Sequence, residues 1–111
     1  MRLAWGLVAT MVVAGCAASL REGLRVREGT VEFRWRRPEA VSVAIAGDFN
    51  GWSASSHAMA REGGLWTRRI ALPPGEYAFM YVVDGREWLT PPVEEKVPDG
   101  FGGWNGRVVV P

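Results

Sequence analysis

Apolar and polar residues alternate along several short segments of the chain, and this period of two is typical of half-buried β-strands. Over residues 30–35, for example, Val31, Phe33 and Trp35 fall on one face and charged residues fall on the other. No segment shows an apolar stripe with the period of a helix, so the predicted fold class is all-β. Strands are predicted at 30–35, 41–46, 65–72, 77–83, a short return strand that carries Trp88, and 107–110.

Glycine and proline separate the predicted strands. Pro73-Pro74-Gly75 is a stop signal, and Asp84-Gly85 is a hairpin signal. Residues 53–62 are expected to form an irregular connection and residues 90–105 a loop. Short strands at regular spacing, with turns between them, are typical of a β-sandwich.

The first 15 residues have the pattern of a secretory leader. Arg2 precedes an apolar run over 3–14, which is too short to span a bilayer, since a spanning helix needs about 20 residues. The run ends in Val13-Ala14-Gly15 directly before Cys16, the only cysteine, and this arrangement resembles the lipobox of bacterial lipoproteins. The resemblance implies cleavage after residue 15 and lipidation of Cys16. The alternative is an ordinary signal peptide or an uncleaved short anchor.

A lipidated Cys16 implies a chain anchored in a bacterial cell envelope, facing the periplasm or the exterior. Similar lipoproteins that stay in the inner membrane carry Asp after the cysteine, whereas Ala17 stands there in this chain, which favours the outer membrane. Residues 16–29 are predicted to be the lipidated cysteine and a polar tether. Residues 30–111 are predicted to be the folded domain.

Composition narrows the function classes. The 13 basic and 12 acidic residues give a net charge of +1, so there is no basic excess for nucleic acid. One cysteine excludes an intrachain disulfide framework and any zinc site built from several cysteines. His57 is expected to be structural or solvent-facing, and the carboxylates to be solvated surface charges rather than the positioned pair of a glycosidase. We expect neither catalysis nor a metal or other cofactor.

Six tryptophans in 111 residues call for an explanation. Five motifs follow one another along the chain: Gly47-Asp48-Phe49-Asn50-Gly51-Trp52, Gly64-Leu65-Trp66, Pro74-Gly75-Glu76-Tyr77, Val83-Asp84-Gly85 and Gly102-Gly103-Trp104-Asn105. Together they resemble the glycogen-binding carbohydrate-binding module of family 48, found in AMP-activated protein kinase β subunits and in branching and debranching enzymes. The resemblance covers about residues 30–110. It implies an immunoglobulin-like (early-set) β-sandwich that binds α-1,4-linked glucan, of glycogen, starch or maltodextrin type.

In the family, two tryptophans form a platform for glucose rings, and by motif position these are Trp52 and Trp88. A flat indole covers the apolar C–H face of a glucose ring while the hydroxyl groups stay hydrated or bonded at the edge. Asn105 matches the family asparagine that bonds sugar hydroxyls. Phe101 matches a bulky apolar residue on a loop that inserts into the curved glucan.

Two positions depart from the family pattern. The family lysine before the Asp-Gly hairpin is Met80 here, and Arg86 is expected to replace its sugar contact because the hairpin is one residue longer. The same insertion would alternatively move Trp88 off the platform. The acidic residue often found two positions after the second tryptophan is Thr90. These departures bear on affinity more than on fold.

Structural roles compete with sugar contact at several aromatic positions. Trp35 and Trp66 lie on strand faces with other apolar residues and are expected in the core. Trp104 stays open between a lid on the core and a contact at the rim of the site.

Turn-forming roles compete in the same way at the polar positions, and Asn105 is alternatively a turn cap. Asp48 and Asn50 are expected to hold their turn through side-chain hydrogen bonds rather than to touch ligand. The competing function for the whole domain is an immunoglobulin-like module that binds an envelope protein and no sugar.

Overall fold

The computed structural model describes residues 22–111. The predicted leader, the lipidation site Cys16 and the first part of the predicted tether lie outside the described residues. Within the described part of the chain, no helix is long and apolar enough to cross a membrane. No group of three or more His, Cys, Asp or Glu side chains within that part is placed to hold a metal ion.

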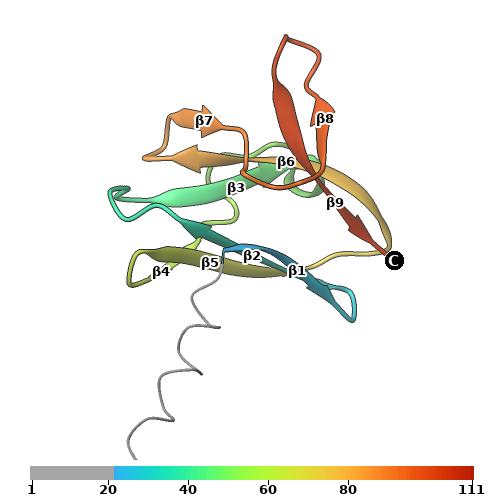
Figure 1. Cartoon of the computed structure of the whole chain (residues 1–111), viewed down its shortest axis with the longest axis horizontal. Helices are drawn as coiled ribbons and strands as arrows, with labels where there is room; N and C mark the ends of the chain where they lie inside the picture. Colours follow the sequence, from blue (N-terminus) through green and yellow to red (C-terminus); the bar gives the residue numbers. More distant parts are fainter. Residues whose placement is uncertain (1–21) are drawn as a thin grey trace, which may run out of the picture.

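The described residues form two antiparallel sheets. Sheet A consists of β1 (Gly23–Arg27), β2 (Thr30–Arg36), β4 (Ala60–Glu62) and β5 (Leu65–Ala71). Sheet B consists of β3 (Val43–Gly47), β6 (Gly75–Val83), β7 (Glu87–Leu89), β8 (Lys96–Pro98) and β9 (Trp104–Val110). The strand order is β1-β2-β5-β4 in sheet A and β3-β6-β9-β8 in sheet B, where β7 also pairs with β6. The two sheets lie as two layers (Figure 1), and the predicted all-β sandwich is confirmed.

Three strands, and the start of a fourth, lie where the sequence predicted none. The tether predicted over 16–29 is wrong for β1, where Leu24 and Val26 alternate with arginines and pack against the core. β4 lies in the predicted irregular connection, and β8 and the start of β9 lie in the predicted loop. Each of these stretches is too short or too charged to show its alternation clearly. Pairing with a longer neighbour holds each one in place: β1 on β2, β4 on β5 and β8 on β9.

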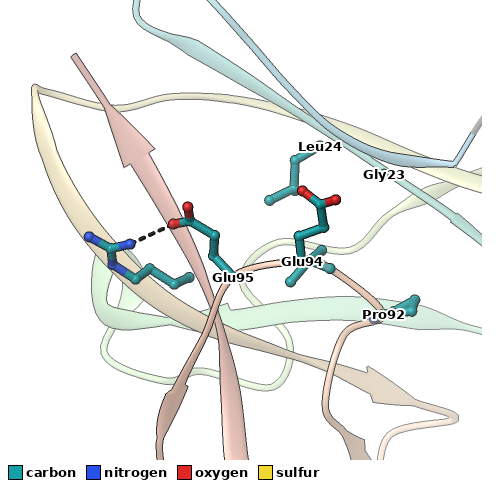
Figure 2. Close-up of a pocket in the computed structure, with 7 residues that line it drawn as sticks. Gly23, Leu24, Pro92, Glu94 and Glu95 are labelled. Carbon is teal, nitrogen blue, oxygen red and sulfur yellow. Dashed lines mark hydrogen bonds and ion pairs between the residues drawn. The ribbon is translucent and has the colours of Figure 1, made fainter.

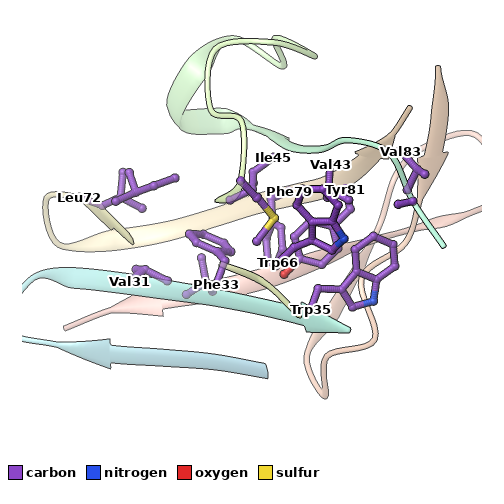
Figure 3. Packing of buried hydrophobic residues seen from close by; sticks show 14 of the residues in the cluster. Val31, Phe33, Trp35, Val43, Ile45, Trp66, Leu72, Phe79, Tyr81 and Val83 are labelled. Atoms are coloured by element: carbon purple, nitrogen blue, oxygen red, sulfur yellow. The ribbon is translucent and has the colours of Figure 1, made fainter. Parts of the chain in front are cut away.

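Aromatic rings from both sheets fill the space between the layers (Figure 3). Trp35 of β2 stacks on Tyr81 of β6, with ring centroids 4.6 Å apart and an interplanar angle of 17°. Phe33 meets Phe79 edge-on at 5.1 Å. Trp66 is the cross-strand partner of Trp35, and its indole N–H donates to the carbonyl oxygen of Arg37 at 2.9 Å. The predicted core positions of Trp35 and Trp66 are confirmed, and these rings join the two sheets into one rigid support.

The turn between β6 and β7 begins at Asp84, as the hairpin signal predicts. Asp84 and Gly85 both have the positive φ that a tight hairpin turn requires, at 53° and 78°. The Asp84 carboxylate accepts hydrogen bonds from the backbone N–H groups of Ser42 and Val41, and these bonds hold the pKa of Asp84 below its ordinary value. The hairpin that carries Trp88 is therefore tied to the segment that leads into β3.

Candidate functional site

The candidate site lies on the outer face of sheet B, the face that points away from the core. Successive residues of a strand point to opposite faces. On β6, Phe79 and Tyr81 point into the core, so Ala78, Met80 and Val82 share the outer face. Cross-strand pairing extends this face over three further strands: Ala44 and Ala46 on β3, Trp88 on β7, and Arg107 on β9.

Trp88 is a half-exposed aromatic residue on this outer face, with 42% of its surface accessible. Its cross-strand partner Val82 is only 1% exposed, and Ala44 on the next strand is also buried, although neither belongs to the core between the sheets. Residues directly opposite in antiparallel strands have Cβ atoms about 5 Å apart, so the Trp88 side chain begins beside Val82. The indole of Trp88 thus begins beside buried apolar side chains, and part of its surface remains accessible to a ligand.

Asn105 lies on the same face and along the same edge of β6 as Trp88. One edge of β6 pairs with β3 along its length, at both Val83 and Phe79. The other edge of β6 pairs with β7 at Val83 and with β9 at Phe79. The strands β7 and β9 therefore lie one after the other along the same edge of β6. Gly106 of β9 is the cross-strand partner of Phe79. Because the two strands are antiparallel, Asn105 lies opposite Met80, the residue after Phe79. The rise of a strand, about 3.4 Å per residue, separates the levels of Trp88 and Asn105 by roughly 7 Å. An indole and an amide are thus spaced along one line on one face.

Trp52 lies at the other edge of β6, just beyond the end of β3. A one-turn 3-10 helix, η2 (Asp48–Asn50), follows β3, and Trp52 is half-buried after it. Its φ of 60° is left-handed, which is uncommon for a bulky residue and costs about 1–2 kcal/mol. Its backbone N–H donates to the carbonyl oxygen of Gly47 at 3.0 Å. The surrounding loop therefore holds this tryptophan in a strained position.

Asn50 provides much of that hold. Its side-chain oxygen accepts hydrogen bonds from the backbone N–H groups of Gly47 and Ser53, at 3.0 and 3.2 Å. Its side-chain nitrogen donates to the carbonyl oxygen of Ile45, at 2.9 Å. Asp48 ties the same turn to β6 by accepting a hydrogen bond from the Ala78 N–H at 2.7 Å. Asp48 and Asn50 hold the turn, as the sequence predicted.

Glycine is required where this turn leaves β3. A Cβ atom at Gly47 would lie 2.7 Å from the carbonyl oxygen of Ala78 and 3.0 Å from the Cβ of Phe79, which is closer than atoms pack. The turn can therefore sit tightly against β6 only with glycine at this position.

His57 is a structural residue of the same loop, which agrees with the first of its two predicted roles. Asn50 Nδ2 lies 2.9 Å from His57 Nδ1 and, because the Asn50 oxygen already accepts two N–H groups, this nitrogen is the donor and Nδ1 the acceptor. The imidazole also meets Phe49 edge-on at 5.7 Å. Burial, with a smaller contribution from the charge of Arg68, lowers the pKa of His57. The neutral imidazole is therefore the form that fits this loop.

Phe101 lies at the tip of the hairpin formed by β8 and β9, which projects beyond the sandwich (Figure 1). It is 94% exposed. The Asp99 carboxylate accepts hydrogen bonds from the N–H groups of Phe101 and Gly103, at 2.7 and 2.9 Å. Sequence reasoning did not single out Asp99, although Pro98-Asp99-Gly100 is a recognisable turn pattern. The exposed ring is thus carried on a hydrogen-bonded loop.

The other positions discussed from the sequence lie in the turn before β7, on the outer face of sheet B or on β9. Arg86 lies in the exposed turn before β7, and Met80 is half-buried on the outer face. Trp104 alternates with Asn105 along β9 and so points to the opposite face, where it is 52% exposed. Trp104 therefore points away from the face that carries Trp88 and Asn105, and it is only partly covered. Thr90 donates its hydroxyl hydrogen to the carbonyl oxygen of Trp104 at 2.7 Å, which joins the end of β7 to the start of β9.

Arg107 forms an ion-pair network that the sequence did not predict. Its guanidinium pairs with Glu76 of β6, at 2.8 Å, and with Glu95 in the loop before β8. Hydrogen bonding and charge together lower the pKa of Glu76 and raise that of Arg107. A pocket of about 320 Å³ opens beside this network, between β1 and the loop over 92–95, with Leu24 on one side and Glu94 on the other (Figure 2). No predicted sugar-binding residue lines this pocket.

Comparison with known proteins gives the family. The model that describes the glycogen recognition site of AMP-activated protein kinase matches residues 29–111, and the chain belongs to this family.

Three relatives show where such domains occur. The chain is 40% identical over 62 residues to a 1,4-alpha-glucan branching enzyme of Corynebacterium efficiens, covering 53% of this chain and 8% of the enzyme. It is 34% identical over 77 residues to an amyloplastic phosphoglucan phosphatase of Castanea sativa, covering 68% and 20%. It is 32% identical over 68 residues to the chloroplastic protein FLOURY ENDOSPERM 6 of Oryza sativa, covering 61% and 12%. The chain thus matches only a small part of each relative.

Proposed function

We propose that this chain binds α-1,4-linked glucan, without catalysis, on the outer face of sheet B. The observation that carries the proposal is the placement of a half-exposed indole, Trp88, and an amide, Asn105, along one edge of β6 in a chain of the glycogen-recognition family. The relatives named as a glucan branching enzyme and a phosphoglucan phosphatase support the same ligand class.

Each proposed contact follows from the chemistry of a glucose ring. Trp88 covers the apolar C–H face of one ring, and Asn105 offers a donor and an acceptor to hydroxyl groups. Trp52 extends the stacking surface from the β3 edge, and Phe101 and Arg86 are edge contacts. So shallow a surface with few polar groups gives a dissociation constant of roughly tens of micromolar to millimolar.

We extend the proposal to a lipid anchor at Cys16. The leader pattern before Cys16 supports an envelope lipoprotein, with the outer membrane favoured over the inner by Ala17. In that location the ligand is a maltodextrin or a surface α-glucan rather than cytosolic glycogen. Several acyl chains on one cysteine give stable attachment, whereas a single chain holds only marginally.

The glucan proposal is tested by electrophoresis through gels that contain amylose or glycogen. We expect the unaltered chain to be retarded, and Trp88→Ala to lower the affinity at least about tenfold because the stacking surface is lost. Trp104→Ala is the matched control, since it removes an exposed indole from the opposite face and should leave retardation unchanged. Unaltered mobility of the native chain in both glucans would exclude the proposal.

The anchor is tested separately by fractionating cells that express the full chain. Cys16→Ser removes the only thiol that can carry the lipid, and we expect the protein to leave the membrane fraction. Ala18→Ser is the matched control and should stay with membranes. Cys16→Ser chains that remain attached to membranes would refute lipidation at this position.

A further inference from the structure

The outer face of sheet A, on the opposite side of the molecule from the candidate sugar site, is lined by arginines. The residues that face the core are Leu24 and Val26 on β1 and Val31, Phe33 and Trp35 on β2, so their neighbours point outward. Those neighbours include five arginines on three adjacent strands: Arg25, Arg27, Arg34, Arg36 and Arg69.

This face differs in charge from the rest of the domain. Four glutamates accompany the five arginines. Glu32 is paired with Arg69 at 3.5 Å, Glu22 and Glu28 lie at the two ends of β1, and Glu62 of β4 shares the face through its partner Leu65. Residues 22–111 hold 11 basic and 12 acidic residues, so the other surfaces and loops hold six basic and eight acidic ones. The basic excess is therefore local to the outer face of sheet A.

The arginines also border two hollows. One, of about 330 Å³, is lined by Arg25, Arg34 and Glu22. The other, of about 270 Å³, is lined by three arginines and one glutamate: Arg25, Arg27, Arg69 and Glu32. A guanidinium group binds phosphate oxygens through two parallel hydrogen bonds, which makes arginine well suited to phosphate groups. Hollows of this kind can admit headgroups between the side chains.

The proposed lipid on Cys16 would bring this face to a membrane. Six residues separate Cys16 from Gly23, the first residue of β1, and seven peptide steps span at most about 25 Å. Because β1 belongs to sheet A, a lipid on Cys16 would hold the arginines within reach of the headgroups. Sheet B and its projecting hairpin lie in the other layer (Figure 1).

We propose that the outer face of sheet A docks on anionic phospholipid headgroups of the membrane that carries the anchor, and so turns the outer face of sheet B toward the glucan. This inference rests on the anchor of the proposed function. Each arginine near an anionic surface adds to the attraction, and the anchor keeps the face at high effective concentration.

The test uses the full chain, purified from membranes and reconstituted in phosphatidylcholine vesicles with or without phosphatidylglycerol. An environment-sensitive dye is placed on Thr67→Cys, on the outer face of β5, or on the control Val109→Cys, on the outer face of β9. Lipidation uses the Cys16 thiol, so the introduced cysteine alone takes the dye. We expect a membrane signal from position 67 only, and only with phosphatidylglycerol.

The combined variant Arg25→Gln, Arg27→Gln and Arg69→Gln should lower the ratio of docked to undocked domains by about a hundredfold. Raising the salt from about 0.1 to about 1 M should weaken docking in the same direction, because the Debye length falls from about 10 to about 3 Å. Equal signals in neutral vesicles, equal signals from positions 67 and 109, or an unchanged signal in the arginine variant would each overturn the proposal.

Failure of docking is distinguishable from failure of the proposed function. The arginine variant should keep its retardation in amylose gels, so loss of docking with normal retardation rejects docking alone. Normal docking without retardation rejects glucan binding alone. A chain that proves unlipidated is tested by flotation with the same vesicles, where binding that depends on phosphatidylglycerol and on the arginines supports docking and its absence rejects it.

Discussion

At the scale of single residues, the loop between β3 and β4 depends on one side chain, Asn50, which connects backbone groups on both sides of the turn to the imidazole of His57. The turn in question carries Trp52 in a left-handed conformation. A strained residue persists only where its surroundings hold it in place. The hydrogen bonds of Asn50 are therefore part of what positions the proposed second stacking residue.

Protonation of His57 should weaken this loop. The neutral ring accepts a hydrogen bond at Nδ1, and a proton there removes the acceptor and places a cation near Arg68. The pKa of His57 in the folded chain is thus below the unfolded value of about 6.5. The contribution of the neutral imidazole to the free energy of unfolding is therefore complete above pH 6.5 and is lost as the pH falls through the folded pKa.

Urea denaturation between about pH 7.5 and pH 5 measures the effect of His57. His57→Gln keeps an amide near Asn50 but cannot titrate, so its free energy of unfolding should fall less over this range than that of the native chain. Acidic groups with lowered pKa values, such as Asp84, are common to both proteins and cancel in the comparison. If the free energy of unfolding of the two proteins depended on pH in the same way, His57 would not contribute to the pH dependence of stability.

The burial of a residue could be predicted from the sequence where the apolar alternation of its own strand determines it. Trp35 and Trp66 lie in the core because apolar alternation already places them there. The Asn50–His57 contact could not be predicted, because it joins two positions of an irregular loop whose path depends on β6. The opposite orientations of Trp104 and Asn105 could not be predicted either, because the sequence predicts a loop over 90–105 and a loop has no alternating faces.

At the scale of elements, β1 extends the sandwich before the segment that the family model matches. Its two apolar residues, Leu24 and Val26, are half-buried and pack against the core cluster. Leu24→Ala should therefore lower the free energy of unfolding by about 1–2 kcal/mol, less than the 2–5 kcal/mol of a fully buried leucine. Arg25→Ala, next to it on the outer face, should change stability by no more than about 0.5 kcal/mol.

Urea denaturation of these two variants distinguishes a strand from a tether. If residues 23–27 were only a tether, Leu24→Ala and Arg25→Ala would both leave the unfolding midpoint unchanged. The longer strands were predictable because their alternation runs over five or more residues. The short strands β4 and β8 were not, because three residues carry no readable period and only the partner strand fixes them.

At the scale of the whole molecule, the sandwich separates two kinds of surface. The outer face of sheet B presents an indole and an amide, whereas the outer face of sheet A presents an excess of arginine. The rigid aromatic core between the sheets keeps these faces turned away from each other. If both proposals hold, one small domain would meet a membrane on one face and a polysaccharide on the other.

This separation predicts that salt affects only one of the two interactions. Stacking on a neutral glucose ring involves no net charge, so retardation in amylose gels should be the same at about 0.1 M and about 1 M salt, whereas docking on anionic vesicles should be lost. The matched variants are Trp88→Ala, which should lose retardation and keep docking, and the triple arginine variant, which should do the reverse. Retardation that falls with salt, or with loss of the arginines, would place the polysaccharide on sheet A and exclude the sheet B site.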